Sequence, residues 1–148
     1  MLARDAMPLL AKHEGVWRGT YRHIRPDLSL VDQHEFRIKA ELPVDGSCAY
    51  RQTSHYWWDD GRTEDRVFEA QFDADQQCIV WDNGRISGHL RELDDFSLYL
   101  TFTFSGDLDT TVCEMIQLSP CGQNRARTWH WFTDHVLTQI TLVNEHRE

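Results

Sequence analysis

The chain has 148 residues, a formal net charge of −9 and 41% hydrophobic residues. This length suits one domain with a substantial core, and the negative charge disfavours binding to nucleic-acid phosphates or to an anionic membrane surface. No apolar run reaches the length of a membrane-spanning helix, and the first residues lack a signal-peptide pattern. We therefore expect a cytoplasmic protein with a single domain over residues 1–148.

A short helix is predicted over residues 5–13, near the start of the chain. Asp5 can cap its N-terminus, and Pro8 is tolerated in a first helical turn. Gly15 is expected to end the helix in a left-handed conformation. The helix would then lead directly into strand-like sequence.

Trp17 follows this helix and is flanked by Gly15 and Gly19. Gly19 falls on the same strand face as Trp17, so its missing side chain is expected to leave room for the indole. We interpret Trp17 as the plug at the closed end of a β-barrel.

The rest of the chain alternates between apolar and polar residues, which is typical of strands with one buried face. The turn signals between these segments include Asp45-Gly46 and Asn83-Gly84. A meander of this length removes its exposed edges by closing on itself. The sequence predicts an all-β fold, an antiparallel up-and-down barrel of about ten strands with a short N-terminal helix and a frayed polar tail over residues 145–148. The expected strands are 16–24, 30–42, 48–58, 62–72, 77–82, 85–93, 96–104, 109–118, 124–133 and 136–144.

The motif Gly15-Val16-Trp17, combined with an arginine on a late strand, resembles the pattern of the lipocalins and the wider calycin superfamily. The resemblance implies that the arginine packs across Trp17 through a cation–π contact and bonds to terminal carbonyl groups. The late arginine is Arg125 or Arg127; alternation does not choose between them, and Arg127 is favoured. The whole sequence is also similar to an uncharacterised bacterial lipocalin-like family. Nitrobindin-type barrels, which have ten strands and can bind haem, are further relatives in shape.

The inward faces of the predicted strands hold aromatic side chains together with a few polar groups, which is the lining expected of a small-molecule pocket. We expect the barrel to bind a small hydrophobic or amphiphilic molecule without a cofactor, and its polar head to be oriented by some of these polar groups. The candidate ligand-binding residues are Tyr21, His23, His34, Phe36, Gln52, Tyr56, Arg66, Phe68, Leu100 and Phe102.

Three alternatives remain open. His130 lies between tryptophans and is a candidate haem ligand. An enzyme on a calycin barrel, such as an isomerase, a cyclase or a pigment lyase, could use His23 and His34 with Glu64 or Glu114 as an acid–base pair. In the third alternative, side chains fill the barrel and the protein serves only in interactions.

Two further expectations concern the surface and the thiols. His55 and Trp57 are predicted to face outward, and a large exposed aromatic side chain is consistent with a homodimer. The cysteines lack the spacing of a metal site and are expected to be reduced; they are Cys48, Cys78, Cys113 and Cys121.

Overall fold

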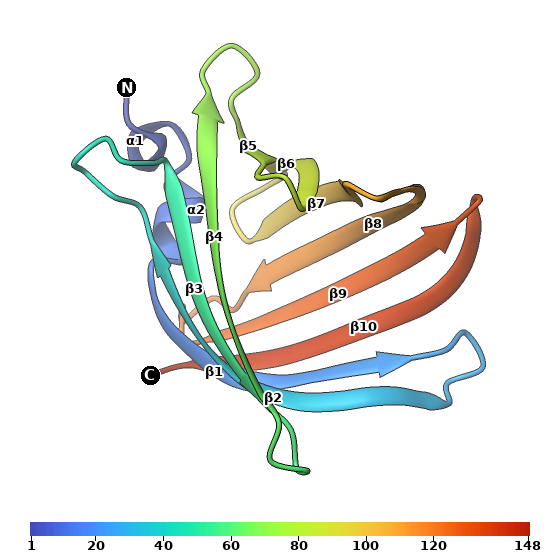
Figure 1. The fold of residues 1–148 in the computed structure, drawn as a ribbon. Helices are drawn as coiled ribbons and strands as arrows, with labels where there is room; N and C mark the ends of the chain where they lie inside the picture. The colour runs from blue at the N-terminus through green and yellow to red at the C-terminus, as the bar shows by residue number, and fades with distance from the viewer.

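The computed structural model describes all 148 residues as two short helices followed by ten strands. Each strand pairs antiparallel with its neighbour in sequence, and β1 pairs with β10 to close the barrel (Figure 1). The predicted all-β class and the antiparallel up-and-down barrel are confirmed. The elements are α1 (Ala3–Ala6), α2 (Pro8–Lys12), β1 (Gly15–Ile24), β2 (Leu30–Glu41), β3 (Tyr50–Trp57), β4 (Thr63–Asp73), β5 (Cys78–Asp82), β6 (Ile86–Glu92), β7 (Ser97–Phe104), β8 (Asp107–Leu118), β9 (Asn124–Thr133) and β10 (Val136–Arg147).

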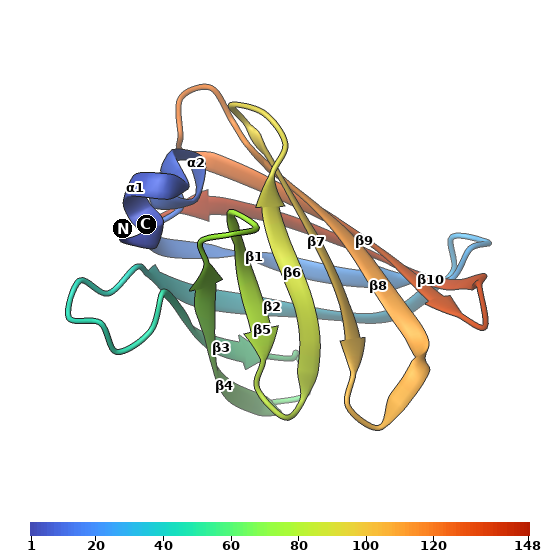
Figure 2. The same cartoon turned by 90° about the horizontal axis from the view of Figure 1, so that it is seen from above.

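The predicted single helix is divided into α1 and α2 at Met7. Asp5 lies inside α1, and the N-cap residue of neither helix makes a capping hydrogen bond through its side chain, so the predicted capping role of Asp5 is wrong. Pro8 occupies the first turn of α2, as expected. Both helices lie at one end of the barrel (Figure 2), where Leu9 and Leu10 are buried in the same cluster as Trp17. None of the helices has the length and apolar character needed to span a membrane.

The two glycines beside Trp17 provide space for the backbone and for an arginine. A Cβ atom on Gly19 would lie 1.9 Å from the carbonyl oxygen of Asn144 on β10. Gly19 therefore allows β1 and β10 to approach each other closely. This replaces the expectation that Gly19 makes room for the indole of Trp17. Gly15 begins β1 with a φ of +135°, and a Cβ atom there would lie 2.7 Å from the Arg147 guanidinium.

The strand pairing around the barrel is shortest between β4 and β5. These strands share only three residue pairs, at Gln71, Phe72 and Asp73 of β4. The part of β4 that precedes Gln71 pairs with β3 alone. Over this stretch β4 has no paired neighbour on its β5 side, so the strand pairing of the barrel wall is interrupted there.

The C-terminal residues belong to the last strand, so the prediction of a frayed tail is wrong. β10 continues to Arg147 and pairs with both β1 and β9. Glu145 is buried, and its carboxylate contacts two arginines. The polar sequence of this segment does not indicate a strand, because its inward-facing charged side chain is paired with arginines inside the barrel and not exposed to solvent.

Candidate functional site

Trp17 forms the floor of the barrel interior and is fully buried. Its indole N–H donates to the carbonyl oxygen of His13, 2.9 Å away, which ties the strand to the end of α2. The guanidinium groups of Arg125 and Arg147 lie 4.5 and 4.4 Å from the centre of the indole ring. The prediction that Trp17 is buried and contacts a late arginine is confirmed, but the stacked late-strand arginine is Arg125, and the preference for Arg127 is wrong.

Arg147 supplies the carbonyl contacts that the calycin resemblance implied for the late arginine. It donates to the carbonyl oxygens of Lys12 and Glu14 at 2.6 Å each, and to that of Gly122 at 3.1 Å. The first of these carbonyls belongs to the C-terminus of α2, where a cation is favourable. Arg125 and Arg147 thus divide between them the roles that the resemblance gave to one residue.

Above Trp17 lies a buried cluster of charged side chains from β8, β9 and β10. Glu145 accepts hydrogen bonds from Arg125 at 2.7 Å and from Arg127 at 2.6 Å. Glu114 faces Arg127 across 3.6 Å, which is an ion pair without a hydrogen bond. We call these four residues the charged floor; they are Glu114, Arg125, Arg127 and Glu145.

The pKa values of the two glutamates of the charged floor are shifted in opposite directions. Burial favours the neutral form of Glu145, but the two arginines outweigh it and hold the pKa of Glu145 below its ordinary value. For Glu114 burial dominates, and it raises the pKa from 4.5 to about 7. When Glu114 is protonated, the two arginines and the single Glu145 carboxylate leave the floor with one net positive charge.

The charged floor also leaves hydrogen-bonding capacity unused. Arg127 Nη2, Glu114 Oε1 and the indole nitrogen of Trp129 are buried and have no hydrogen-bond partner. Arg127, Glu114 and Trp129 all line the cavity above the floor. A buried polar atom without a partner is costly, so these atoms favour a bound polar group between them.

A cavity of about 260 Å³ occupies the barrel interior above this floor. Its walls are aromatic: Trp129 and Trp131 stack on one side with ring centres 5.8 Å apart, and Phe102 contacts Trp129 edge to face. The charged floor is nearly inaccessible to solvent, whereas the Glu64 and Arg66 side chains on β4 are 42% and 24% exposed. The cavity is therefore open at the end away from Trp17.

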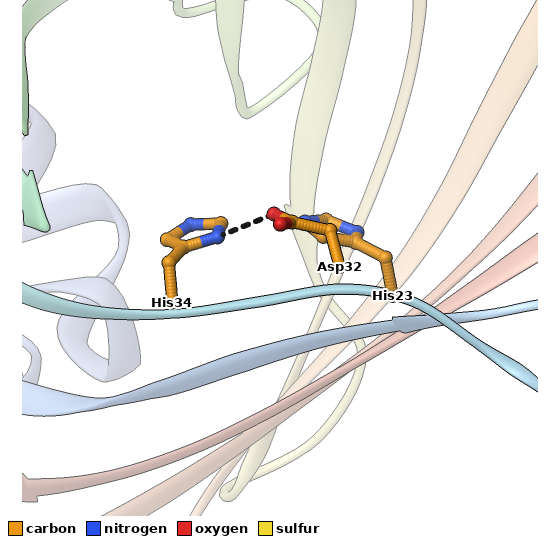
Figure 3. A group of neighbouring side chains, drawn as sticks. All are labelled: His23, Asp32 and His34. Carbon is orange, nitrogen blue, oxygen red and sulfur yellow. Dashed lines mark hydrogen bonds and ion pairs between the residues drawn. The ribbon is translucent and has the colours of Figure 1, made fainter. Parts of the chain in front are cut away.

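Near the open end, three polar side chains of β1 and β2 meet on the inner face of the barrel (Figure 3). His34 Nδ1 lies 3.1 Å from Asp32 Oδ2, and His23 directs a ring nitrogen toward the same carboxylate. The indole N–H of Trp58 donates to both oxygens of Asp32, at 3.0 and 3.1 Å. His23 Nδ1 is bonded to Thr141 Oγ1 at 2.7 Å. We call His23, Asp32 and His34 the rim cluster.

Burial lowers the pKa of both histidines of the rim cluster. The pKa of His23 falls to about 4, and that of His34 also lies below its ordinary value. Both imidazoles are therefore neutral near pH 7.

The structure brings most of the sequence-predicted ligand-binding residues together around the cavity. Phe36 is the exception, because it is fully buried behind Tyr21. His130 is exposed on the outer face of β9, while its neighbours Trp129 and Trp131 point inward, so the structure gives His130 no access to the cavity. The predicted residues that line the cavity are Tyr21, His23, His34, Gln52, Tyr56, Arg66, Phe68, Leu100 and Phe102.

Three members of the site are absent from the candidates that the sequence predicts. Glu145 falls in the predicted frayed tail, although strict alternation from Thr141 through Val143 places it on the inner face. Asp32 shares a strand face with the candidate His34. Trp129 enters the prediction only as a neighbour of His130, although alternation along β9 places it on the inner face.

A family model matches residues 6–148, which is almost the whole chain; it describes the N-terminal part of DUF3598, a domain of unknown function. The chain belongs to the DUF3598 family. No curated protein matches the sequence. A crystal structure of a DUF3598 protein of unknown function from Nostoc punctiforme is 20% identical, with a TM-score of 0.67 over 94% of this chain and 49% of the other. This DUF3598 domain thus spans about half the length of that relative.

Two other solved structures share the fold of this DUF3598 domain at low identity. The S-type phycobiliprotein lyase CPES from Guillardia theta is 13% identical, with a TM-score of 0.69 over 95% of this chain and 91% of the lyase. Rv2717c from M. tuberculosis is 12% identical, with a TM-score of 0.60 over 97% of each chain. Identities this low support a shared lipocalin-like barrel and nothing about activity.

Proposed function

We propose that this protein binds a small amphiphilic organic molecule with an anionic head inside its barrel. The observation that carries the proposal is the unpartnered Arg127 Nη2, buried at the base of an aromatic cavity. A carboxylate there would accept the free N–H of Arg127 and of Trp129, and the net positive charge that the floor carries when Glu114 is protonated would favour it. The aromatic walls would bury the apolar body of the ligand.

The cavity volume limits the size of this ligand. Pockets for drug-sized molecules measure about 300–1,000 Å³, and the cavity of about 260 Å³ is slightly smaller. A medium-chain acid or a small aromatic acid is the best match. A haem is too large for this volume, and His130 faces away from it, so the structure gives the haem alternative no support.

Decanoic acid and decanol provide a matched test of the anionic head, since they differ only in the terminal group. Each is titrated against the fluorescence of anilinonaphthalene sulfonate bound to the protein. We expect the probe to bind saturably. The acid should displace it with a dissociation constant about tenfold lower than that of the alcohol, a difference of about 1.4 kcal/mol in binding free energy. Equal displacement by both would show that the charged floor does not recognise an anion, and absence of saturable probe binding would refute the proposal.

Arg66 and Arg51 allow a matched test of the cavity wall. Arg66 lines the cavity and pairs with Glu64, whereas Arg51 pairs with Glu69 on the outer face. Both pairs are partly exposed and contribute little to stability. Arg66→Leu should alter the preference among acids of different length and leave the melting temperature nearly unchanged, while Arg51→Leu should alter neither. A shift in melting temperature without any change in ligand preference would indicate a purely structural role for Arg66.

A second candidate function is proton transfer to a bound molecule by Glu114. The favouring observation is a carboxyl group enclosed in the cavity wall with a pKa of about 7, because such a group exchanges a proton most effectively near neutral pH. The fold shared with a phycobiliprotein lyase is compatible with this chemistry and does not identify a substrate. Conversion of a bound ligand that is lost in Glu114→Gln, with ligand affinity retained, would favour this candidate over simple binding.

A further inference from the structure

We propose that His23, Asp32 and His34 form a binding site for a divalent transition-metal ion at the open end of the cavity. One potential ligand atom from each residue lies within 4.8 Å of those of the other two. His34 Nδ1 and Asp32 Oδ2 are already 3.1 Å apart, a separation that two neighbouring ligands of one metal ion can share. Two imidazoles and one carboxylate suit zinc, iron(II), nickel and copper.

The pairing of β1 with β2 brings these three residues together. His23 lies directly opposite Asp32 in the register, and His34 follows Asp32 by two residues on the same strand face. The register shifts immediately after His23, between His23 and Ile24. Because all three side chains come from strands that are paired across most of their length, the cluster is built on a rigid part of the barrel.

Neighbouring side chains hold the candidate ligands in place in the way that outer residues orient metal ligands. Trp58 donates its indole N–H to Asp32, and Thr141 Oγ1 contacts His23 Nδ1 while accepting a hydrogen bond from Trp131. With Nδ1 engaged by Thr141, the nitrogen that His23 turns toward Asp32 in Figure 3 is Nε2. That nitrogen is free to bind a metal in the tautomer whose Nδ1 proton is donated to Thr141 Oγ1. In that tautomer the side-chain amide of Gln139, whose Nε2 lies 3.3 Å from Nδ1, turns its oxygen toward the ring instead.

The site would keep a coordination position open toward the cavity. His23 and His34 line the same cavity as the aromatic walls, and three protein ligands leave at least one position of a tetrahedral metal for water or an exogenous ligand. A closed structural zinc site would use four protein ligands. The arrangement is therefore of the open type, in which the metal can bind a polar group of a molecule held in the barrel.

Cobalt(II) is the probe for this proposal, because it has visible absorption bands that report its coordination, and zinc is the competitor. Purified protein without added organic ligand is titrated with cobalt(II), and zinc is then added. We expect one equivalent to bind and to be displaced by zinc. His23→Asn and Asp32→Asn should each weaken binding at least about tenfold, since replacing a residue that only orients a metal ligand already costs about that much.

Asp65→Asn is the matched control. Asp65 also contacts a histidine, His55 at 2.6 Å, but it lies on the outer face of the barrel and is not part of the rim cluster. This variant should bind the metal as the wild type does. Equal affinity in the wild type and in His23→Asn would overturn the proposal, as would loss of binding in Asp65→Asn.

X-ray absorption at the zinc edge of the loaded wild-type protein keeps the test independent of whether the variants fold. Two imidazole nitrogens at about 2.0–2.1 Å and oxygen in the remaining positions are expected. Sulfur at about 2.3 Å would place the metal at a cysteine and would contradict the site. Because no organic molecule is present, failure of this test leaves the proposed amphiphile binding standing, and the reverse also holds.

Discussion

At the residue scale, the stability of the closed end depends on Trp17. The side chain is fully buried, contacts two guanidinium groups and fixes the end of α2 through its indole N–H. Its position could be predicted from Gly15-Val16-Trp17 alone. The identity of the stacked arginine could not, because Arg125 and Arg127 lie two residues apart and share the inner face of β9.

Replacement of Trp17 by Ala should lower the free energy of unfolding by about 3–5 kcal/mol, the usual cost of truncating a large buried aromatic side chain. The loss includes both cation–π contacts and the bond to His13. Urea denaturation followed by circular dichroism measures it. A loss below about 1 kcal/mol would show that the helices and the barrel end are held together without the indole.

Glu114 should make the protein less stable as the pH rises from about 4.5 to about 7. In this window the unfolded chain releases the proton of Glu114 while the folded chain keeps it, so the unfolded state gains stability with increasing pH. Glu114→Gln should therefore become more stable relative to the wild type across the window, by on the order of 3 kcal/mol at its upper end. Chemical denaturation of both proteins at several pH values measures the difference, and a constant difference would contradict the raised pKa.

At the element scale, the closure of the barrel depends on how closely β1 and β10 approach each other. Alternating apolar residues predict the strands well, because the alternation has a period of two wherever one face is buried. The same rule extended the seventh strand to Phe96, which lies outside β7 and is 47% exposed. It also missed the end of β10, since the inner face there carries Glu145 in place of an apolar residue.

Gly19→Ala should destabilise the protein by about 1–3 kcal/mol, the typical cost of forcing a methyl group into packed space. The added Cβ would meet the backbone of β10 at Asn144 and Glu145, which cannot move aside without breaking the β1–β10 pairing. Gly106→Ala is the control, because a Cβ there meets nothing within 4 Å. Thermal denaturation of both variants provides the comparison, and equal melting temperatures would show that the two strands can separate without cost.

At the scale of the whole molecule, the sequence predicted the closed barrel and most of the residues around its cavity, but not the two clusters of polar groups inside it. The charged floor combines residues from three strands, and the rim cluster combines β1 with β2. Their proximity depends on strand register, which the sequence pattern does not specify. The shared fold does not identify the ligand either, because barrels of this shape hold different molecules.

The homodimer stays a prediction. His55 is exposed, but Trp57 is half-buried, donates to Glu35 and lies under the Arg18 guanidinium. An interface on the outer face of β3 would cover these side chains. Light scattering across micromolar concentrations should show the mass of a dimer, and a monomer throughout would exclude it.

If the barrel interior is a binding cavity, a substitution that fills the cavity should abolish or weaken ligand binding. Leu100→Trp adds an indole on the cavity wall, whereas Val67→Trp makes a similar addition on the outer face, where Val67 is 62% exposed. The measurement is the dissociation constant of anilinonaphthalene sulfonate for each folded variant. We expect Leu100→Trp to weaken binding about tenfold or more, or about 1.4 kcal/mol, and Val67→Trp to bind as the wild type does. Undiminished binding in Leu100→Trp would show that the probe binds on the outer surface and not in the cavity.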